Sequence, residues 1–280
     1  MAMLLLACEA IPGQFEVATV DHGLRPEARD ECALVAAACA ERGVPCEVLA
    51  VEVGVGNVQA MAREARYAAL ADWANRQQCA AIATAHHADD QAETLLMRLN
   101  RGSGVAGLAG VRAAQYRDDL ALAIIRPLLA FRRAELAQVA ADAGQAVARD
   151  PSNADDRFDR VRLRQAMADC DWLVPQAIAR SAGNLAEAYE ALTVFAAQSR
   201  PQMVSKTADG YLMQPGPLRE VNRRVLAMVM QEMGGKPRGD DVARLLDRLE
   251  NGGGGNVAGV LATVASGKWL LRPEPPRRES

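Results

Sequence analysis

Short apolar runs alternate with longer segments of helical spacing over the first hundred residues, and this rhythm constrains the fold more than any other feature. Predicted strands lie at residues 16–20, 46–51 and 79–85. Predicted helices lie at residues 1–10, 28–42, 57–77 and 89–99. Because the strand runs lack polar alternation, they are typical of strands buried on both faces. The chain is therefore predicted to be an α/β protein, a parallel sheet with helices on both faces.

The alternation of short apolar runs and helical segments ends after Arg101, and apolar residues at helical spacing dominate the rest of the chain. Residues 102–110 are rich in glycine and predict a loop, and Pro175 is expected to break a helix. The later elements are an extended piece at 124–129 and helices at 132–143, 161–199, 218–233 and 240–251. Further strands are expected at 211–213 and, as a closing hairpin, at 260–264 and 269–272. The expected domains are a first domain at 1–165, a mainly helical second domain at 166–272 and a disordered tail at 273–280.

The net charge of −3 is unevenly distributed along the 280 residues. Residues 1–97 carry 6 basic and 14 acidic side chains, whereas residues 98–164 carry 12 and 8. A basic middle beside an acidic front suits a polyanionic partner that contacts the middle of the chain. Arginines that coat solvated helices would give the same pattern, so charge alone leaves both interpretations open.

The six cysteines argue against several classes of site. None forms a Cys-x-x-Cys pair, and no set of them with the three histidines has zinc-ligand spacing, so buried thiols are expected. The longest apolar run near the start, residues 1–7, is far shorter than the ~20 residues needed to cross a bilayer. It also lacks the basic leader and cleavage site of a signal peptide. A cytoplasmic location is therefore expected.

The strongest local signal is the run Thr-Ala-His-His-Ala-Asp-Asp-Gln-Ala-Glu-Thr at residues 84–94, where a predicted strand ends and a helix begins. In open parallel sheets, ligands bind outside the carboxyl ends of the strands. Asp90, Glu93 and Thr94 share one helix face, and two carboxylates there suit Mg²⁺ or a substrate amine. The structural alternative is a helix cap, an aspartate followed three residues later by glutamate. The two adjacent histidines favour a binding site.

Two weaker segments also suit a nucleotide. Residues 20–25 follow a predicted strand, and Gly23 permits a tight turn or close approach of the backbone to a ligand. Residues 102–107 fit Gly-x-Gly-x-x-Gly, but they follow a helix rather than a strand, which argues against a dinucleotide-binding fold. We interpret them as flexible backbone, introduced by Arg101, that folds over a nucleotide or phosphate.

The third polar segment, residues 149–164, is a turn followed by arginines. Arg157, Arg160 and Arg164 share one face if this segment is helical. Guanidinium groups suit phosphate and carboxylate recognition. Pairing of these arginines with neighbouring aspartates on a solvated surface is the alternative, and the segment alone does not decide between the two.

Taken in this order, the motifs resemble those of the tRNA(Ile)-lysidine synthetases. The matching stretches are VDHGLRPE (20–27), AREARYAAL (62–70), TAHHADDQAETLLMRLNRGSGVAGLAG (84–110), IIRPLLAFRRAEL (124–136) and RDPSNADDRFDRVRLR (149–164). The resemblance implies an N-type ATP pyrophosphatase (PP-loop) fold followed by a helical tRNA-binding domain. It also implies ATP, Mg²⁺ and free lysine as reactants, and isoleucine tRNA with a CAU anticodon as substrate. The wobble cytidine would be adenylated on its C2 oxygen, and lysine would then displace AMP to give lysidine.

The resemblance also assigns roles by position. The implied catalytic residues are His87, Asp90, Glu93, Arg157 and Arg160. Among them, Asp90 and Glu93 are candidates to meet Mg²⁺ or the lysine amine. The residues implied to bind ATP are Val20, Asp21, His22, Gly23, Arg63, Arg66, Arg101, Gly102, Ser103 and Gly104. The residues implied to contact tRNA are Arg132, Arg133, Arg162 and Arg164. Homodimers occur in such a family, so pairing with a second copy is an open expectation.

One departure from the family pattern concerns the ATP site. The sequence contains no Ser-Gly-Gly-x-Asp-Ser loop, whose backbone N–H groups would hold pyrophosphate, and no strand ahead of such a loop. A polypeptide of these 280 residues is therefore expected to bind ATP poorly and to be inactive. Residues 1–6 resemble the helix that follows such a loop, and their uncapped start favours a misplaced start codon over true loss.

Two alternative functions stay open at this point. A tRNA-thiolating enzyme with the same PP-loop fold would generally need a cysteine pair, and the sequence has no Cys-x-x-Cys. A non-catalytic remnant that binds tRNA or a nucleotide would account for the missing loop. ATP hydrolysis distinguishes the remnant from an enzyme, because a remnant would bind tRNA with salt-sensitive affinity and show no turnover.

Overall fold

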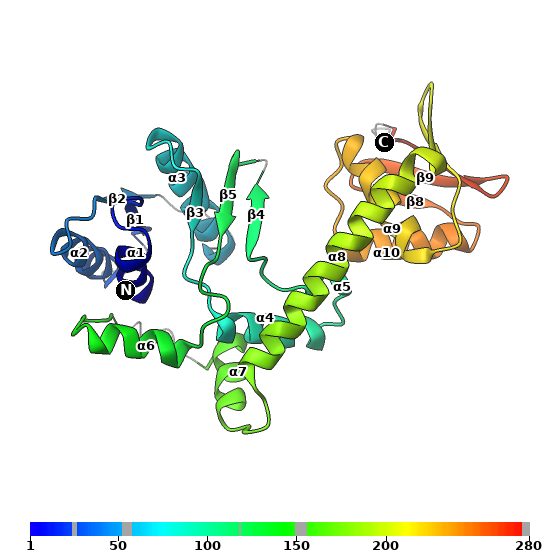
Figure 1. Cartoon of the computed structure of the whole chain (residues 1–280). Coiled ribbons are helices and arrows are strands. Elements are labelled where there is room, and N and C mark those ends of the chain that lie inside the picture. The colour runs from blue at the N-terminus through cyan, green and yellow to red at the C-terminus, as the bar shows by residue number, and fades with distance from the viewer. Residues whose placement is uncertain (24–26, 52–57, 118, 149–155, 276–280) are drawn as a thin grey trace. The chain divides into compact units, whose positions relative to one another are not determined.

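The computed structural model describes residues 1–23, 27–51, 58–117, 119–148 and 156–275 (Figure 1). It divides the chain into two compact units, Met1–Ala186 and Glu187–Ser280, and the division falls inside helix α8 (Pro175–Met203). Each unit has an apolar core of its own. No helix of the described residues is long and apolar enough to cross a membrane.

The first unit confirms the predicted α/β class, although its parallel strands lie in two sheets. In one sheet, β1 (Val17–Asp21) runs parallel to β2 (Cys46–Ala50). In the other, β3 (Ala81–Ala83) runs parallel to β5 (Leu122–Ile125), and β4 (Ala114–Arg117) is an antiparallel edge strand beside β5. The sequence does not predict β4, because Ala-Gln-Tyr-Arg is a mostly exposed stretch without an apolar run.

The helices of the first unit lie beside and below these strands in Figure 1. They are α1 (Ala2–Ala10), α2 (Glu27–Ala40), α3 (Val58–Arg76), α4 (Ala88–Asn100), α5 (Val105–Leu108), α6 (Arg133–Asp142), α7 (Asp159–Ala168) and the start of α8. α2 and α3 contact the strands directly, α2 at β1 and β2 and α3 at β1 and β3. Trp73 and Ala74 of α3 belong to the same buried cluster as Leu49 of β2 and Ile82 of β3. One helix therefore joins the two sheets through a shared core.

The carboxyl ends of the parallel strands present the polar segments that the sequence singles out. The backbone N–H of Thr84 donates to the carbonyl of Ile125 at 2.9 Å, so the ends of β3 and β5 lie side by side. The chain then enters α4 at Ala88, and the residues between strand and helix are those of the strongest motif. Parts of two other motifs, residues 24–26 and 149–155, lie outside the described residues.

The second unit is built on an antiparallel sheet with strand order β6-β7-β10-β9-β8. Its strands are β6 (Val204–Thr207), β7 (Gly210–Met213), β8 (Gly255–Val257), β9 (Val260–Ala265) and β10 (Lys268–Pro273). Its helices are the end of α8, α9 (Arg219–Glu232) and α10 (Gly239–Glu250). Val225, Leu246, Trp269 and Leu271 lie in one buried cluster, so helices and sheet share a core. The unit is thus less helical than the sequence suggests.

The division inside α8 falls later than the boundary expected at residue 165. α7 packs against α4. Arg132 Nη1 donates to Gln176 Oε1 at 3.1 Å, so the start of α8 is tied to the first unit. Pro175 begins α8 rather than breaking a helix, because proline is tolerated in the first helical turn.

The last strand extends into the segment 273–280, whose first two residues are therefore ordered and not disordered as expected. β10 ends at Pro273, and the backbone N–H of Glu274 donates to the carbonyl of Gly259 at 2.8 Å. Residues 276–280 of the expected tail lie outside the described residues.

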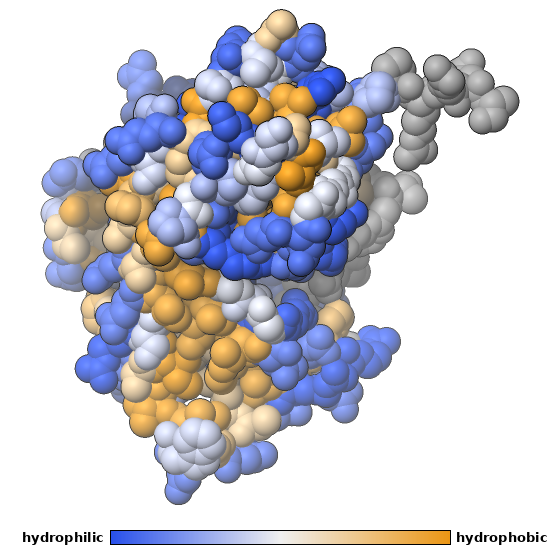
Figure 2. All heavy atoms as spheres, turned by 90° about the vertical axis from the view of Figure 1, so that its right-hand side faces the viewer, coloured by the Kyte–Doolittle hydropathy of each residue, from blue (hydrophilic) through white to orange (hydrophobic). Residues whose placement is uncertain are grey.

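Apolar side chains also reach the surface. Figure 2 shows orange, apolar areas between blue, polar ones on one face of the molecule. Leu99, Trp172 and Val194 are among the large apolar side chains that are exposed. Scattered exposure of this kind is usual in folded proteins and by itself indicates no partner.

Candidate active site

The start of α4 is a capping box made by His87 and Asp90. The backbone N–H of Asp90 donates to His87 Nδ1 at 3.4 Å, and the backbone N–H of His87 donates to Asp90 Oδ2 at 3.1 Å. The capping alternative therefore holds at this helix start, but the cap is His87 rather than an aspartate. Glu93 takes no part in this capping box, so its carboxylate can bind other groups.

Glu93 lies at the centre of the site, with 2% of its surface exposed. Arg160 Nε donates to Oε2 at 2.5 Å, and Arg164 Nε donates to Oε1 at 2.7 Å, so α7 holds both carboxylate oxygens. Burial alone raises the pKa of Glu93, but the two guanidinium groups outweigh it and lower the pKa below its usual value. The buried carboxylate is therefore charged at neutral pH, and its charge is paired.

Arg160 bridges the two carboxylates that the helix spacing places on one face. Its Nη2 lies 3.1 Å from Asp90 Oδ1 while its Nε holds Glu93. The side chain of Arg160 remains 43% exposed, against 27% for Arg164. Hydrogen bonding to Glu93 raises the pKa of Arg164. The pair presents fixed cations to solvent beside a helix start, which suits a phosphate or a carboxylate ligand.

Arg157, Arg160 and Arg164 of the segment 149–164 do not share one helix face as expected. α7 begins at Asp159, so Arg157 lies in the exposed turn before the helix and not on its face. Arg162 points to a local partner, because its Nη2 lies 2.5 Å from Asp159 Oδ1. The structure therefore joins Arg160 and Arg164 to the site, and the local pairing alternative describes Arg162.

Asp89, which the sequence does not single out as a site residue, ties α4 to α6. Its Oδ2 accepts from the backbone N–H of Arg133 at 2.8 Å and from Arg132 Nε at 3.3 Å. Burial alone raises the pKa of Asp89, but these hydrogen bonds lower it below its usual value. Arg132 is thus engaged within the protein, while Arg133 is exposed. Their contact with tRNA stays a prediction.

His86 stands among cations at the carboxyl end of β3. Its Nδ1 lies 3.0 Å from Thr84 Oγ1. Burial lowers the pKa of His86; the nearby Asp90 opposes this, and three neighbouring arginines lower it further. These arginines are Arg63, Arg126 and Arg160. This edge of the sheet therefore has the positive field that an anionic ligand requires.

Among these cations, Arg126 is not predicted from the sequence to be a site residue. It is 6% exposed, and its Nη1 donates to the carbonyl of Arg112 at 2.6 Å. Its Nε is buried and has no hydrogen-bond partner in the described part of the chain. A buried, partly unsatisfied guanidinium is costly without a compensating role. The signal in the sequence is an arginine that interrupts the apolar run at 124–129.

The end of β1 forms the tight turn that Gly23 predicts. Gly23 has φ +62°, and its N–H donates to Asp21 Oδ1 at 2.9 Å. Asp21 also pairs with Arg29, whose Nε lies 3.6 Å from Oδ2. Val20 packs against the core cluster shared by the two sheets, and His22 is half-buried at the turn. Binding of ATP by these residues stays a prediction.

α3 contributes Arg63 and Arg66, which are both exposed. The guanidinium of Arg63 lies over the ring of the buried Tyr67, 5.1 Å from its centre. This cation–π contact holds the guanidinium of Arg63 over Tyr67. The positive charge of Arg63 contributes to the lowered pKa of His86. Arg66 is placed one turn away and faces solvent.

The glycine-rich segment 102–110 is fastened to α4 rather than flexible. Gln91, which is 4% exposed, donates from Nε2 to the carbonyl of Val111 at 2.9 Å and accepts its N–H at 2.7 Å. Arg98 Nη1 donates to the carbonyl of Gly110 at 3.2 Å and to a second carbonyl of the segment at 2.6 Å. A Cβ atom at Gly110 would lie 2.5 Å from Gln91 Oε1, so this close approach requires glycine.

The residues expected to cover the nucleotide begin this segment. Gly102 has φ +67° and follows Arg101, the residue that ends α4. The N–H of Ser103 donates back to the last turn of α4, and Gly104 precedes the single turn of α5. The expected flexible loop is therefore an ordered turn and a short helix, because its backbone groups find partners on α4.

The described residues do not gather a metal site. No group of three or more histidine, cysteine, aspartate or glutamate side chains among them is arranged to hold an ion. The oxygens of Asp90 and Glu93 already accept from arginines and a helix cap, so the pair does not fit Mg²⁺, which needs free oxygen ligands. All six cysteines are free, and burial raises the pKa of the Cys39 thiol to about 12.

Known proteins resemble this chain in sequence and in fold. Residues 1–170 match the PP-loop domain family. A tRNA(Ile)-lysidine synthase of Novosphingobium aromaticivorans is 46% identical over 99% of this chain and 86% of its own length. A tRNA(Ile)-lysidine synthase of Zymomonas mobilis is 36% identical over 100% of this chain and 87% of its own length. The solved U34-tRNA thiolase NcsA from Methanococcus maripaludis, with its [4Fe-4S] cluster, is 18% identical with a TM-score of 0.54, and the match covers 66% of this chain and 68% of that one. The last likeness concerns the fold alone.

Proposed function

Because the chain belongs to the tRNA(Ile)-lysidine synthase family and contains its PP-loop domain, we propose that it attaches lysine to the wobble cytidine of isoleucine tRNA. Membership of the family makes it a ligase that uses ATP and modifies tRNA. The observation that carries the proposal is the buried Glu93, held by Arg160 and Arg164 on the helix that follows the parallel strand β3. This is where ligands bind in such sheets.

The proposed reaction has two steps. In the first, the C2 oxygen of the cytidine attacks the α-phosphorus of ATP, and pyrophosphate leaves with the electron pair of the broken P–O bond. In the second, the ε-amine of free lysine attacks C2, and AMP leaves with the C2 oxygen. The lysine ammonium group gives up one proton to become the attacking amine, and its nitrogen gives up a second proton to solvent as the C–N bond forms. Negative charge grows on phosphate oxygens in both steps, so fixed cations beside them lower the barrier.

Arg160 and Arg164 are proposed to supply this fixed charge. Glu93 holds them in place, and Arg160 keeps an exposed side for a phosphate oxygen or for the carboxylate of the substrate lysine. Glu93 is poorly suited to remove a proton, since its pKa is lowered and its oxygens are occupied. Asp90 also accepts from Arg160 and from the helix cap, but its side chain is 20% exposed, so of the two carboxylates it is the one proposed to meet the incoming ammonium group.

Mg²⁺ is proposed to enter with ATP as a counter-ion of its phosphates, with water as most of its other ligands. His87 and Asp90 would then orient the helix start whose N–H groups and dipole favour anionic oxygens. Val20 to Gly23, Arg63, Arg66 and the turn at Arg101–Gly104 are proposed around the nucleotide. A homodimer is a further proposal, which size-exclusion chromatography with light scattering would test.

The missing Ser-Gly-Gly-x-Asp-Ser sequence limits what these 280 residues can do alone. We propose that they bind tRNA but hold pyrophosphate weakly, because the N–H groups of that loop would form the nest for pyrophosphate and the 280 residues do not contain its sequence. A second candidate function, a tRNA-binding protein without turnover, is favoured by this one observation. The thiolase alternative is disfavoured by the absence of a Cys-x-x-Cys pair and by Cys39, whose raised pKa keeps it protonated.

A direct test compares two proteins in one assay. The first is the 280-residue chain, and the second is the same chain preceded by the first strand and loop of the Novosphingobium aromaticivorans relative. Each is incubated with ATP, Mg²⁺, lysine and an isoleucine tRNA transcript with a CAU anticodon, and lysidine is measured by mass spectrometry of the nucleosides. We expect lysidine from the extended protein and at least about 100-fold less from the chain alone.

The two outcomes separate the two proposals. Lysidine from neither protein would contradict the ligase function and leave the tRNA-binding candidate. Comparable lysidine from both would contradict only the role given to the missing loop. A methionine tRNA with the same anticodon is the substrate control, and Glu93→Gln in the extended protein is the site control.

A further inference from the structure

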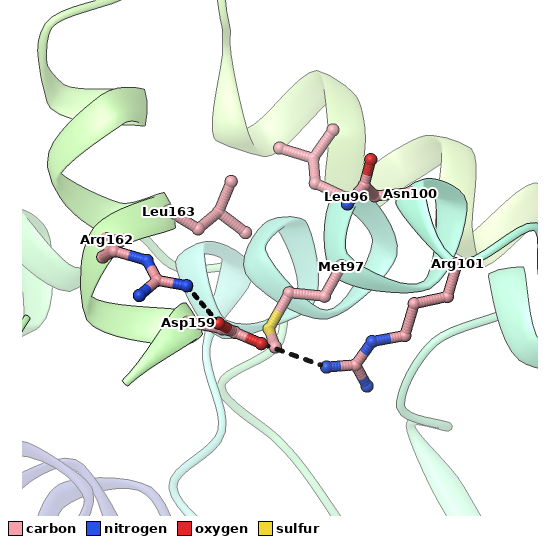
Figure 3. Close-up of a pocket in the computed structure, with 7 residues that line it drawn as sticks. All are labelled: Leu96, Met97, Asn100, Arg101, Asp159, Arg162 and Leu163. Carbon is pink, nitrogen blue, oxygen red and sulfur yellow. Dashed lines mark hydrogen bonds and ion pairs between the residues drawn. The ribbon is translucent and has the colours of Figure 1, made fainter. Parts of the chain in front are cut away.

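Between α4 and α7 lies an open pocket of about 260 Å³, and none of its apolar residues has a proposed role so far (Figure 3). Arg101 lines this pocket and also begins the turn proposed around the nucleotide, so it can serve only one of the two ligands at a time. The residues that line the pocket are Leu96, Met97, Asn100, Arg101, Asp159, Arg162 and Leu163. Three of them are apolar, one is an amide that can donate and accept, and three are charged. The pocket therefore combines an apolar wall with a polar rim, a composition typical of small-ligand sites.

The pocket is lined by the same two helices, α4 and α7, that meet at Glu93. Leu96, Met97, Asn100 and Arg101 follow Glu93 at positions three, four, seven and eight along α4, so they lie on one helix face. On α7, Leu163 lies between the arginines that bind Glu93. The middle of the pocket is displaced from Glu93 by on the order of 8 Å along α4. A polymer that places one unit at Glu93 can place the next one here.

The rim carries more positive than negative charge. Asp159 lies between two arginines, with Oδ2 3.6 Å from Arg101 Nη2 and Oδ1 2.5 Å from Arg162 Nη2, as Figure 3 shows. The single carboxylate orients both guanidinium groups but neutralises only one of them. The side chains of Arg101 and Arg162 remain 63% and 60% exposed. Both therefore retain N–H donors for a phosphate ligand.

We propose that this pocket binds an unstacked nucleobase of the tRNA, the neighbour of the cytidine that is modified, with Arg101 and Arg162 on the flanking phosphates. The proposal rests on the proposed function. A base that undergoes chemistry must leave the stack, which also exposes the neighbouring base. Proteins hold such bases on apolar or guanidinium surfaces and read their edges with side-chain amides. Met97 and Leu163 provide the apolar surface, and Asn100 provides the amide.

Adenine of ATP has the same chemistry, and the pocket is assigned to tRNA because of its position. The turn of Val20 to Gly23 lies at the carboxyl end of β1 and is proposed to border the adenine. The pocket lies instead toward the far end of α4, beside Arg162, which is proposed to contact tRNA. The experiment distinguishes the two sources because the RNA is titrated first without ATP and ATP is then added as a competitor.

The test measures RNA binding, so it does not require turnover. Two anticodon stem-loop RNAs carry fluorescent 2-aminopurine, one on the 5′ side and one on the 3′ side of the wobble cytidine. Each is titrated with the whole 280-residue chain in the absence of ATP and lysine. We expect a fluorescence change from one of them, because the base enters the pocket. Met97→Ala and, separately, Asn100→Ala should raise the Kd by about 5-fold and reduce that change.

The matched control is Leu99→Ala, which removes an exposed apolar side chain from α4 outside the pocket. It should leave both the Kd and the fluorescence unchanged, and thermal unfolding of all three variants checks that each one folds. Equal weakening by Leu99→Ala, silence of both labelled RNAs, or loss of the signal on adding ATP would overturn the proposal. ATP competition would assign the pocket to adenine. A pocket-dependent signal without any lysidine in the turnover assay would support this subsite and contradict the proposed reaction.

Discussion

Glu93 can keep its charge in a nearly dry position only because Arg160 and Arg164 hold both of its oxygens. Removing the charge of Glu93 leaves Arg164 without this carboxylate. Arg160 keeps Asp90 as a partner, and both guanidinium groups stay partly in water. Glu93→Gln should therefore lower the free energy of unfolding by about 1–3 kcal/mol, measured by urea denaturation. The double variant with Glu93→Gln and Arg164→Leu should recover part of the lost free energy of unfolding, because the cation left unpaired by the first change is removed.

The control for this change is Asp119→Asn, at an exposed ion pair with Arg117. Surface pairs contribute little, so its effect should stay within about 1 kcal/mol. If Glu93→Gln were equally mild, the arginines would not depend on Glu93, and its proposed holding role would be wrong.

The lowered pKa of Glu93 also predicts how stability depends on pH. A carboxyl group whose pKa is lower in the folded state than its ordinary value of 4.5 binds protons more readily when unfolded. Its stabilising contribution is therefore complete above pH 4.5 and is lost as pH falls through the lowered pKa. The urea midpoint of the wild type should fall steeply below this pH, and that of Glu93→Gln should fall less. If the urea midpoints of the two proteins fell in parallel with pH, Glu93 would not be the source of the pH dependence. Asp89 and Glu220 also have lowered pKa values, so they contribute a slope that both proteins share.

Spacing along one helix predicted part of this site and could not predict the rest. The positions of Asp90 and Glu93 indicate a shared face, which Arg160 confirms by bridging them. The partners of Glu93 lie 67 and 71 residues away in sequence, and no local period links positions so far apart. Arg126 was missed for the same reason, since the strand before it pairs with β3, which is distant in sequence.

At the scale of elements, α4 serves two purposes through two faces. One face carries Asp90 and Glu93, and another carries Gln91 and Arg98, which fasten the glycine-rich segment. Gln91→Ala should cost about 1–3 kcal/mol, because it leaves the backbone groups of Val111 without partners. Hydrogen exchange should accelerate at the Val111 amide and much less at Ser103, which bonds to the end of α4.

Gln138→Ala is the matched control, because Gln138 bonds only to the exposed Asp142 on its own helix. It should leave exchange in the glycine-rich segment unchanged. Slow exchange at Val111 in the Gln91 variant would mean that the segment is held by Arg98 alone.

The elements that the sequence missed are short and polar. β4, β6 and β8 are edge strands, so they need only one partner and lack an apolar run that would predict them. α8 continues to Met203, beyond the expected end at residue 199, and includes Pro201. Long helices such as α3 and α9 were predicted because the apolar residues that face the core recur at helical spacing along the sequence.

At the scale of the whole molecule, the division inside α8 implies that the second unit folds without the first. Its cluster of buried side chains includes Val225, Leu246, Trp269 and Leu271, and it is closed by its own helices and sheet. A fragment of residues 175–280, which retains the whole of α8, should therefore show a single cooperative thermal transition by circular dichroism. Leu246→Ala in this fragment should cost about 2–5 kcal/mol, because Leu246 is fully buried, whereas Leu218→Ala, at an exposed position, should cost far less. A broad transition that neither variant shifts would mean that this core forms only in the presence of the first unit.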